Sequence, residues 1–131
     1  MRGCIGTLAA SEPIPQAIAN AAISAGARDP RFEPVSLREL SECDIEISIL
    51  GPLTRVRSMD EIVAGRHGLV VEKDGRRGLL LPQVAQKYGW TAREFLRQTY
   101  AKAGLAPSEE IGSASVQAFE AIVFGELDDI R

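Results

Sequence analysis

The sequence predicts an α+β fold in a single domain, with helices packed on a mixed or largely antiparallel sheet, and three local patterns carry this prediction. In "GLVVEKDGRRGLLLP" two apolar runs flank Asp74-Gly75, a dipeptide typical of two-residue hairpin turns that need positive φ at both positions. "CDIEISIL" alternates isoleucines with polar residues, the period of a half-buried strand. "WTAREFLRQTYAKAGL" combines Thr91 and Glu94 as a capping box with Gly104 as a terminator, which indicates a helix. The full predicted order is β-α-β-α-ββ-α-α-β.

The first third of the chain supplies the opening strand and helix of that order. "RGCIGTL" is apolar and glycine-rich, which favours a short strand over residues 2–8. Small and branched apolar residues then recur on one helical face, which predicts a helix from about Pro15 to Ala25 that Gly26 ends. Pro30 and Pro34 exclude regular structure from "ARDPRFEPVSLREL", which we expect to be an ordered loop.

The remaining elements follow from similar local signals. "CDIEISIL" is the second strand, "GPLTRVRS" a connector, and "SMDEIVAG" a short helix capped by Ser58. After the hairpin, Pro82 opens a short helix that runs to Tyr88 and ends at Gly89. "SVQAFEAIVFGEL" is rich in aromatic and branched residues, so we expect it to be a closing strand, with a solvated tail behind it.

Composition limits the class of protein. The chain has 131 residues, of which 45% are hydrophobic and 25% charged, as in an ordinary folded domain of this length. No apolar run approaches the roughly 20 residues of a membrane span, and the N-terminus lacks the pattern of a signal peptide. We therefore expect a cytoplasmic protein of one domain, residues 1–131, that does not associate with a membrane.

Cysteine, histidine and charge exclude further classes. Cys4, Cys43 and the single histidine, His67, are too few for a structural zinc site, so the sequence predicts no metal and no other cofactor. In a reducing compartment both thiols are expected to stay free. The net charge is −3, and only three of the fifteen basic residues are lysines. This balance argues against a broad nucleic-acid surface but permits a local basic patch.

A series of motifs runs through nearly the whole chain in a recognisable order. They are "RGCIG", "DPRFEPV" followed by "EL", "EISIL", "GRHGLVV", "LLLPQVA", "GW" with "EFL", and "KAGL". In this order they resemble the AMMECR domain, whose microbial members are called protein A of the AmmeMemoRadiSam system. The resemblance implies genomic association with a Memo-like protein and a radical-SAM enzyme, and a surface cleft near the cysteine motif.

The resemblance also implies a difference at the N-terminus. Family members usually carry a further segment, with helix and strand, ahead of the cysteine motif, and Met1 stands where they have leucine. The chain is therefore expected to be N-terminally short for the family. Loss of such a segment would expose a sheet edge or an apolar patch.

The cysteine motif can be interpreted in two ways. Cys4 can be a small buried residue, with Gly3 and Gly6 allowing close packing of the strand. Alternatively, the glycines let a ligand approach the backbone, Arg2 supplies positive charge, and Cys4 supplies a thiolate for catalysis or binding. A radical-SAM partner that abstracts hydrogen from glycine would also find glycines beside this thiol.

Five other positions complete the candidate site. Arg28 and Arg31 can clamp a carboxylate or phosphate around Asp29, or they can simply form ion pairs on an ordered loop. His67 becomes a catalytic candidate if it lies within hydrogen-bonding reach of Cys4.

Gln83, in "LLLPQVA", can present its amide to a ligand, although a role at the start of a helix is simpler.

Two functions from different classes remain at this point. The first is a catalytic or substrate-binding subunit of a modification pathway with the Memo-like and radical-SAM partners, working through a cleft around the cysteine motif. The second is a non-enzymatic module that binds nucleic acid or a protein partner through the same basic residues. The sequence leaves the substrate, the oligomeric state and the question of enzyme activity open.

Overall fold

The predicted hairpin at Asp74-Gly75 is confirmed. In the computed structural model, which describes residues 1–9 and 11–126, strand β3 (Gly68–Lys73) pairs antiparallel with β4 (Arg76–Leu80). The turn residues have φ of 53° at Asp74 and 77° at Gly75. Positive φ at both positions gives the turn a twist that matches the flanking strands.

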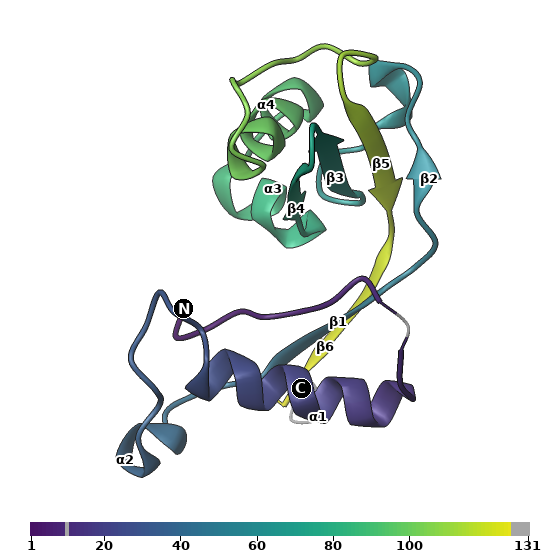
Figure 1. The fold of residues 1–131 in the computed structure, drawn as a ribbon. Coiled ribbons are helices and arrows are strands. Elements are labelled where there is room, and N and C mark those ends of the chain that lie inside the picture. Colours follow the sequence, from purple (N-terminus) through teal and green to yellow (C-terminus); the bar gives the residue numbers. More distant parts are fainter. Residues whose placement is uncertain (10, 127–131) are drawn as a thin grey trace. The chain divides into compact units, whose positions relative to one another are not determined.

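The hairpin belongs to a four-stranded sheet in the order β2-β5-β3-β4. Its other strands are β2 (Thr54–Arg55) and β5 (Ser115–Phe119), which pair antiparallel with each other, while β5 also pairs antiparallel with β3. Helices α3 (Pro82–Tyr88) and α4 (Ala92–Lys102) pack on this sheet (Figure 1). The α+β class with antiparallel pairing is therefore confirmed.

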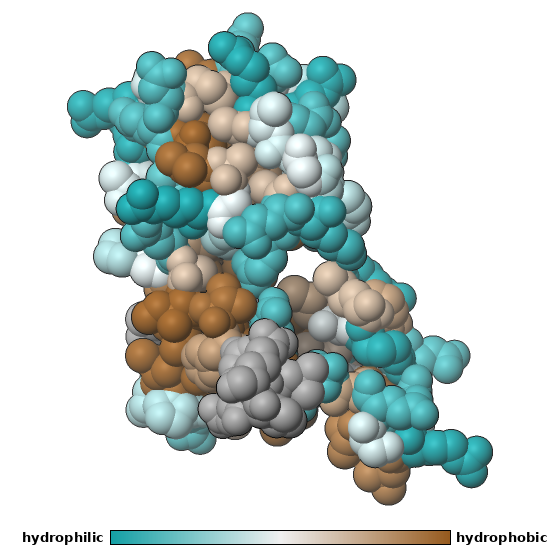
Figure 2. Space-filling view, turned by 180° about the vertical axis from the view of Figure 1, so that it is seen from behind, coloured by the Kyte–Doolittle hydropathy of each residue, from teal (hydrophilic) through white to brown (hydrophobic). Residues whose placement is uncertain are grey.

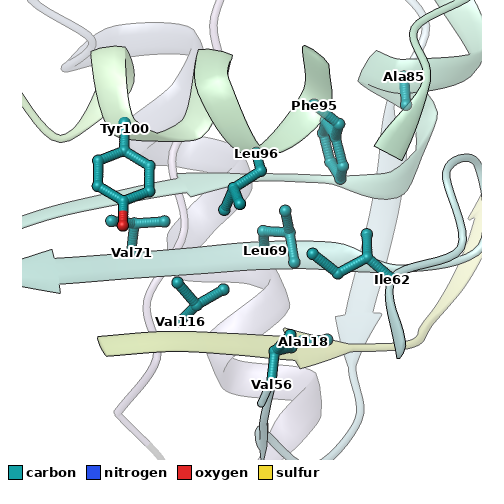
Figure 3. Close-up of a cluster of buried hydrophobic side chains, with 10 residues drawn as sticks. All are labelled: Val56, Ile62, Leu69, Val71, Ala85, Phe95, Leu96, Tyr100, Val116 and Ala118. Atoms are coloured by element: carbon teal, nitrogen blue, oxygen red, sulfur yellow. The ribbon is translucent and has the colours of Figure 1, made fainter. Parts of the chain in front are cut away.

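The hydrophobic core lies between the helices and one face of this sheet. Figure 3 shows side chains from α4 pointing towards those of β3 and β5. Phe95, Leu96, Leu69 and Val71 are completely buried. Thr99 is also buried, and its hydroxyl donates to the carbonyl of Phe95 over 2.7 Å, which satisfies a polar group in an apolar setting. The ten residues of the cluster are Val56, Ile62, Leu69, Val71, Ala85, Phe95, Leu96, Tyr100, Val116 and Ala118.

Both predicted helices after the hairpin are confirmed with their end signals. Gly89 ends α3 in the left-handed conformation at φ 64°, which a glycine adopts without strain. Thr91 caps α4 by accepting the N–H of Glu94 over 3.2 Å. The predicted capping box is only half formed, because the Glu94 carboxylate accepts from Gln98 Nε2 over 2.8 Å instead of from the N–H of Thr91.

The described chain divides into two compact units, and the boundary falls within two strands. The first unit comprises Met1–Ile47 and the chain from Phe124 onward, and the second comprises Ser48–Val123. Strands β1 (Glu46–Leu50) and β6 (Ala121–Gly125) form a two-stranded sheet. Hydrogen bonds from Gly51 N–H to Glu120 O (2.7 Å) and from Glu126 N–H to Ile45 O (3.2 Å) at its two ends show that the strands run antiparallel.

The first unit contains helices α1 (Ile14–Ala27) and α2 (Leu37–Leu40). No residue of α1 is fully buried, and Ile14 and Ile23 are more than half exposed. Leu37 and Leu40 of α2 are exposed as well. Figure 2 shows brown, hydrophobic areas among hydrophilic ones on the surface. Within the described residues, the sealed hydrophobic core therefore belongs to the second unit.

The predicted opening strand is wrong, and the order β-α-β-α-ββ-α-α-β loses its first member. Residues 2–8 have no strand pairing in the described structure. The Cys4 N–H donates instead to the carboxylate of Asp29. A Cβ at Gly3 would lie 1.8 Å from the carbonyl oxygen of Ala25, so the segment runs directly against the backbone of α1. Its glycines serve a close contact with a helix rather than pairing in a sheet.

Other boundaries also differ from the prediction. The expected loop before residue 41 contains α2, because Ser36 and Glu39 form a complete capping box. Helix α1 continues through Gly26, and Arg28 caps it. The helix expected after Ser58 is a single 3-10 turn, Met59–Glu61, without a side-chain cap from that serine.

The closing strand is divided at Glu120. Its first part, β5, belongs to the four-stranded sheet, and its second part, β6, pairs with β1. The predicted connector before residue 59 contains the short strand β2, which pairs with β5. Of the predicted solvated tail over residues 126–131, Glu126 forms hydrogen bonds with Ile45 at the end of the two-stranded sheet. Residues 127–131, which include Leu127, the last residue of the predicted strand, lie outside the described residues.

Candidate functional site around Cys4

The carboxylate of Asp29 is the centre of the candidate site in the first unit. Asp29 follows the end of α1, and it is 4% exposed. Its Oδ1 accepts from the backbone N–H and from Nε of Arg31, both over 3.0 Å. Its Oδ2 accepts from Arg31 Nη2 over 2.7 Å and from the Cys4 N–H over 3.0 Å. A buried carboxylate is stabilised in its charged form by such a set of donors.

These contacts shift the pKa values of both partners. The side-chain hydrogen bond from Arg31 holds the pKa of the Asp29 carboxyl well below its usual range, and the backbone N–H groups of Cys4 and Arg31 contribute. The same pair raises the pKa of Arg31. Asp29 is therefore ionised at neutral pH, and it acts as an acceptor only.

The backbone of Cys4 is held by hydrogen bonds, while the residue itself is exposed to solvent. Besides the N–H bond to Asp29, its carbonyl accepts from Arg31 Nη2 over 3.4 Å. Both cysteines are free thiols, with Cys4 exposed and Cys43 partly buried. Cys4 does not pack as a buried apolar residue, so the structure argues against the first of the two interpretations of the motif.

The two glycines of the motif differ in their surroundings. Gly3 is required by the approach of Ala25, because any side chain at this position would collide with the helix backbone. A Cβ at Gly6 would meet nothing within 4 Å. We expected both glycines to leave space for a ligand to approach the backbone. That space is present at Gly6, whereas Gly3 is in contact with the helix.

Arg2 pairs with an acidic residue that the sequence reasoning did not place in the site. Its Nε and Nη2 donate to the two oxygens of Glu39 over 3.2 and 3.1 Å, and Nη2 also donates to the carbonyl of Glu33 over 3.1 Å. Glu39 accepts the N–H of Ser36 in the capping box as well. The backbone hydrogen bond from Ser36 and then the bond from Arg2 lower the pKa of Glu39, and the bond with Glu39 raises that of Arg2. The sequence pattern Ser-Leu-Arg-Glu over residues 36–39 is typical of a capping box, and it could have indicated that Glu39 has a fixed position.

Charge in this part of the chain is largely compensated. Arg2 is paired with Glu39, and Arg31 with Asp29. Arg28 caps α1 through its backbone N–H, is exposed, and forms no ion pair with any residue in 1–9 or 11–126. Of the three candidate arginines, Arg28 is the one whose charge is available to a ligand.

The remaining two candidates belong to the second unit. The Nδ1 of His67 accepts the N–H of Val63 over 3.0 Å. Gln83 lies in the first turn of α3, and its Nε2 donates to the hydroxyl of Ser48 over 2.9 Å. The structure therefore groups Arg2, Gly3, Cys4, Asp29 and Arg31, while a pairing of Cys4 with His67 stays a prediction.

Neither a metal site nor a membrane-spanning helix occurs among the described residues. No group of three or more histidine, cysteine, aspartate or glutamate side chains in the described part of the chain is arranged to hold a metal ion. No helix among those described is both long and apolar enough to cross a membrane.

Together, these features define an α+β protein with an exposed cysteine on a carboxylate-anchored loop. A family model described as AMMECR1 matches residues 1–124, and the chain belongs to this family. Protein MJ0810 of Methanocaldococcus jannaschii is 42% identical over 98% of the chain and 67% of its own length. Protein PF1979 of Pyrococcus furiosus is 42% identical over 96% of the chain and 63% of its own length.

A solved structure is similar to this chain in fold and in sequence. The crystal structure of the uncharacterized protein PH0010 from Pyrococcus horikoshii has a TM-score of 0.91 and 40% identity, and the match covers 95% of this chain and 64% of that one. The chain thus spans about two thirds of the length of these relatives.

Proposed function

We propose that the chain is a cytoplasmic substrate-binding or catalytic component of a modification pathway, in which the exposed Cys4 loop contacts the substrate or a partner protein. The single observation that carries the proposal is the anchoring of Cys4 by Asp29. Two backbone groups of Cys4 are held in the Asp29–Arg31 pair, while the residue itself is exposed. An exposed cysteine on a loop whose position is fixed by hydrogen bonds to a buried carboxylate and its arginine partner is suited to contact a partner protein at low entropic cost.

The resemblance to the AMMECR domain suggests the partners in this proposal. They are a Memo-like protein and a radical-SAM enzyme, as in the microbial gene clusters of the family. The pairing of Arg2 and Arg31 with acidic residues favours this proposal over a nucleic-acid interface, because paired guanidinium groups have fewer donors left for phosphates.

The proposal is tested by coexpressing the chain anaerobically with both partners. We expect a mass change on the Cys4 peptide, or partner binding that Cys4→Ser abolishes, while Cys43→Ser leaves both unchanged. Retained output in Cys4→Ser together with loss in Arg31→Ala would contradict a role for the thiol and would favour a binding module. A steep salt dependence of RNA affinity would point to the nucleic-acid alternative.

A further inference from the structure

A second candidate site lies entirely within the second unit, at the end of the four-stranded sheet where β5 ends and β3 begins. The pocket has a volume of about 350 Å³, and its polar lining comes from Arg55, Glu61, Arg66, His67 and Glu120. This volume is at the small end of the range typical of small-molecule sites, about 300–1,000 Å³.

The strand register places Arg55 on the pocket's side of the sheet. Arg55 pairs with Gln117, and side chains alternate between faces, so Arg55 shares a face with Phe119, another lining residue. Val56 and Ala118 point to the opposite face, where they join the core under the helices. The ring of Phe119 extends over Gly68, where an added Cβ would lie 2.2 Å from it. Phe119 is itself only 2% exposed because its ring covers Gly68, so the accessible group on this face is the exposed guanidinium of Arg55.

The ring of His67 is held in one orientation by a tight loop. Val63 and His67 exchange two hydrogen bonds, from His67 N–H to Val63 O (2.9 Å) and from Val63 N–H to His67 Nδ1 (3.0 Å). Gly65 allows this loop with a φ of 89°, and Gln86 Nε2 donates to the Gly65 carbonyl over 3.0 Å. The imidazole is thus oriented before any ligand binds.

The hydrogen bond to Nδ1 also determines the tautomer. A nitrogen that accepts an N–H carries no proton, so the neutral ring has its proton on Nε2. No acceptor for this Nε2–H occurs among residues 1–9 and 11–126. His67 in this state donates a hydrogen bond to a ligand and does not accept a proton at Nε2.

The charges in the pocket restrict the ligand. Arg66 and Glu120 form a close ion pair, and the hydrogen bond and the charge of Arg66 lower the pKa of Glu120. Glu61 accepts the N–H of Arg57 over 3.0 Å. The two carboxylates offset the two guanidinium groups of the lining, so no surplus positive charge is present to compensate a dianion such as phosphate. A planar carboxylate matches both the guanidinium of Arg55 and a single N–H donor.

We propose that this pocket binds a small monocarboxylate with a short apolar body, whose carboxylate accepts from Arg55 and from Nε2–H of His67. The apolar part of the ligand lies against Pro52, which lines the pocket and is exposed. The inference is independent of the role of Cys4.

The test uses the full chain, in which His67 is the single histidine, so its ring signals need no assignment. A long-range proton–nitrogen spectrum of the imidazole is recorded while benzoate is added, with benzamide and inorganic phosphate as comparison probes. We expect an Nε2–H tautomer in the free protein and a saturable shift of Nε2 with benzoate, but not with the other two probes.

Matched variants separate the pocket from general charge effects. Arg55→Gln is expected to weaken benzoate binding at least about tenfold, because it removes a charged hydrogen-bond donor. Arg57→Gln removes the same charge nearby without removing a lining residue, and it is expected to leave the affinity unchanged. An Nδ1–H tautomer, equal shifts with benzamide or phosphate, or full affinity in Arg55→Gln would overturn the proposal. Backbone spectra of both variants verify that the fold is retained.

Discussion

The carboxylate of Asp29 accepts the backbone N–H of Cys4 over 3.0 Å, across 25 residues of sequence. This bond joins the N-terminal segment to the turn after α1. Arg31 Nη2 strengthens the connection, because it donates both to the Asp29 carboxylate and to the carbonyl of Cys4. Asp29 is the one buried residue among the described residues of the first unit.

Acidification is expected to release the Cys4 segment. The pKa of Asp29 in the folded protein is held well below the usual value of about 3.9. Between the pKa of Asp29 in the folded protein and its pKa in the unfolded chain, the unfolded state therefore binds more protons. The contribution of Asp29 to the free energy of unfolding, which is complete above about pH 4, is lost as the pH falls through the pKa of the folded state. Backbone amide signals of Cys4 and Arg31 followed from neutral to acid pH measure this release. Asp29→Asn should weaken the attachment already at pH 7, and an unchanged acid transition in this variant would contradict the assignment.

The two glycines of the motif are expected to respond differently to alanine. Gly3→Ala places a Cβ against the carbonyl of Ala25, so the segment must move away from α1 and the Cys4–Asp29 bond is lost. Gly6→Ala is the matched control, since nothing lies within 4 Å of the new Cβ. We expect a change of less than about 0.5 kcal/mol in the free energy of unfolding for Gly6→Ala, and a larger loss for Gly3→Ala. Thermal unfolding of both variants, with the Cys4 amide signal as a local probe, decides between these outcomes.

Cys4 is expected to react with thiol reagents before Cys43 does. Cys4 is exposed and Cys43 is partly buried, so a reagent reaches the first without any opening of the structure. Native protein is treated with iodoacetamide for short times, and the two cysteine peptides are quantified by mass spectrometry. Cys4→Ser removes the fast phase if this assignment is correct, whereas a fast phase that survives in this variant would assign it to Cys43.

The second unit is expected to be the more protected part of the chain in hydrogen exchange. Leu69 and Val71 are completely buried, and their strand β3 has a pairing partner on each side. Helix α1 has no fully buried residue. Amides of β3 and α4 should therefore exchange most slowly, and those of α1 faster, because local opening exposes less apolar surface there. Equal protection of α1 and α4 would show that α1 is stabilised by contacts absent from the described structure.

Truncation in the core provides a measure of its packing. Leu96→Ala removes a side chain with no exposed surface, so a loss of about 2–5 kcal/mol in the free energy of unfolding is expected. Val63→Ala is the control, since Val63 is half exposed and only its backbone orients His67. Urea unfolding of both variants measures the difference. A small effect of Leu96→Ala would mean that the core collapses around the gap.

Local signals predicted the hairpin and the helices α3 and α4 of the second unit. These signals depend only on neighbours along the chain, and each lies at the turn or helix end that it predicted. They are Asp74-Gly75 in the hairpin, Pro82 and Gly89 at the ends of α3, and Thr91 and Gly104 at the ends of α4. The same kind of signal was present at Ser36 and Glu39, where prolines nearby favoured the wrong interpretation as a loop.

The N-terminal segment shows where such reasoning fails. The composition of "RGCIGTL" is that of a strand, but a strand exists only where another backbone pairs with it. The Cys4 N–H is bound by a side chain instead, and Gly3 lies against a helix. Similarly, the continuous pattern of "SVQAFEAIVFGEL" did not reveal that its two halves belong to different sheets.

The sequence by itself determined the α+β class, the hairpin, both helices of the second unit and the membership of residues 1–124 in a family. Only the tertiary structure decided that Asp29 holds Cys4, that Glu39 pairs with Arg2 from 37 residues away, and that Val63 sets the tautomer of His67. The physical reason is that turns and helix caps depend on neighbours along the chain. The partner of a charged side chain or a lone backbone N–H is instead whichever group the folded chain brings within about 3 Å.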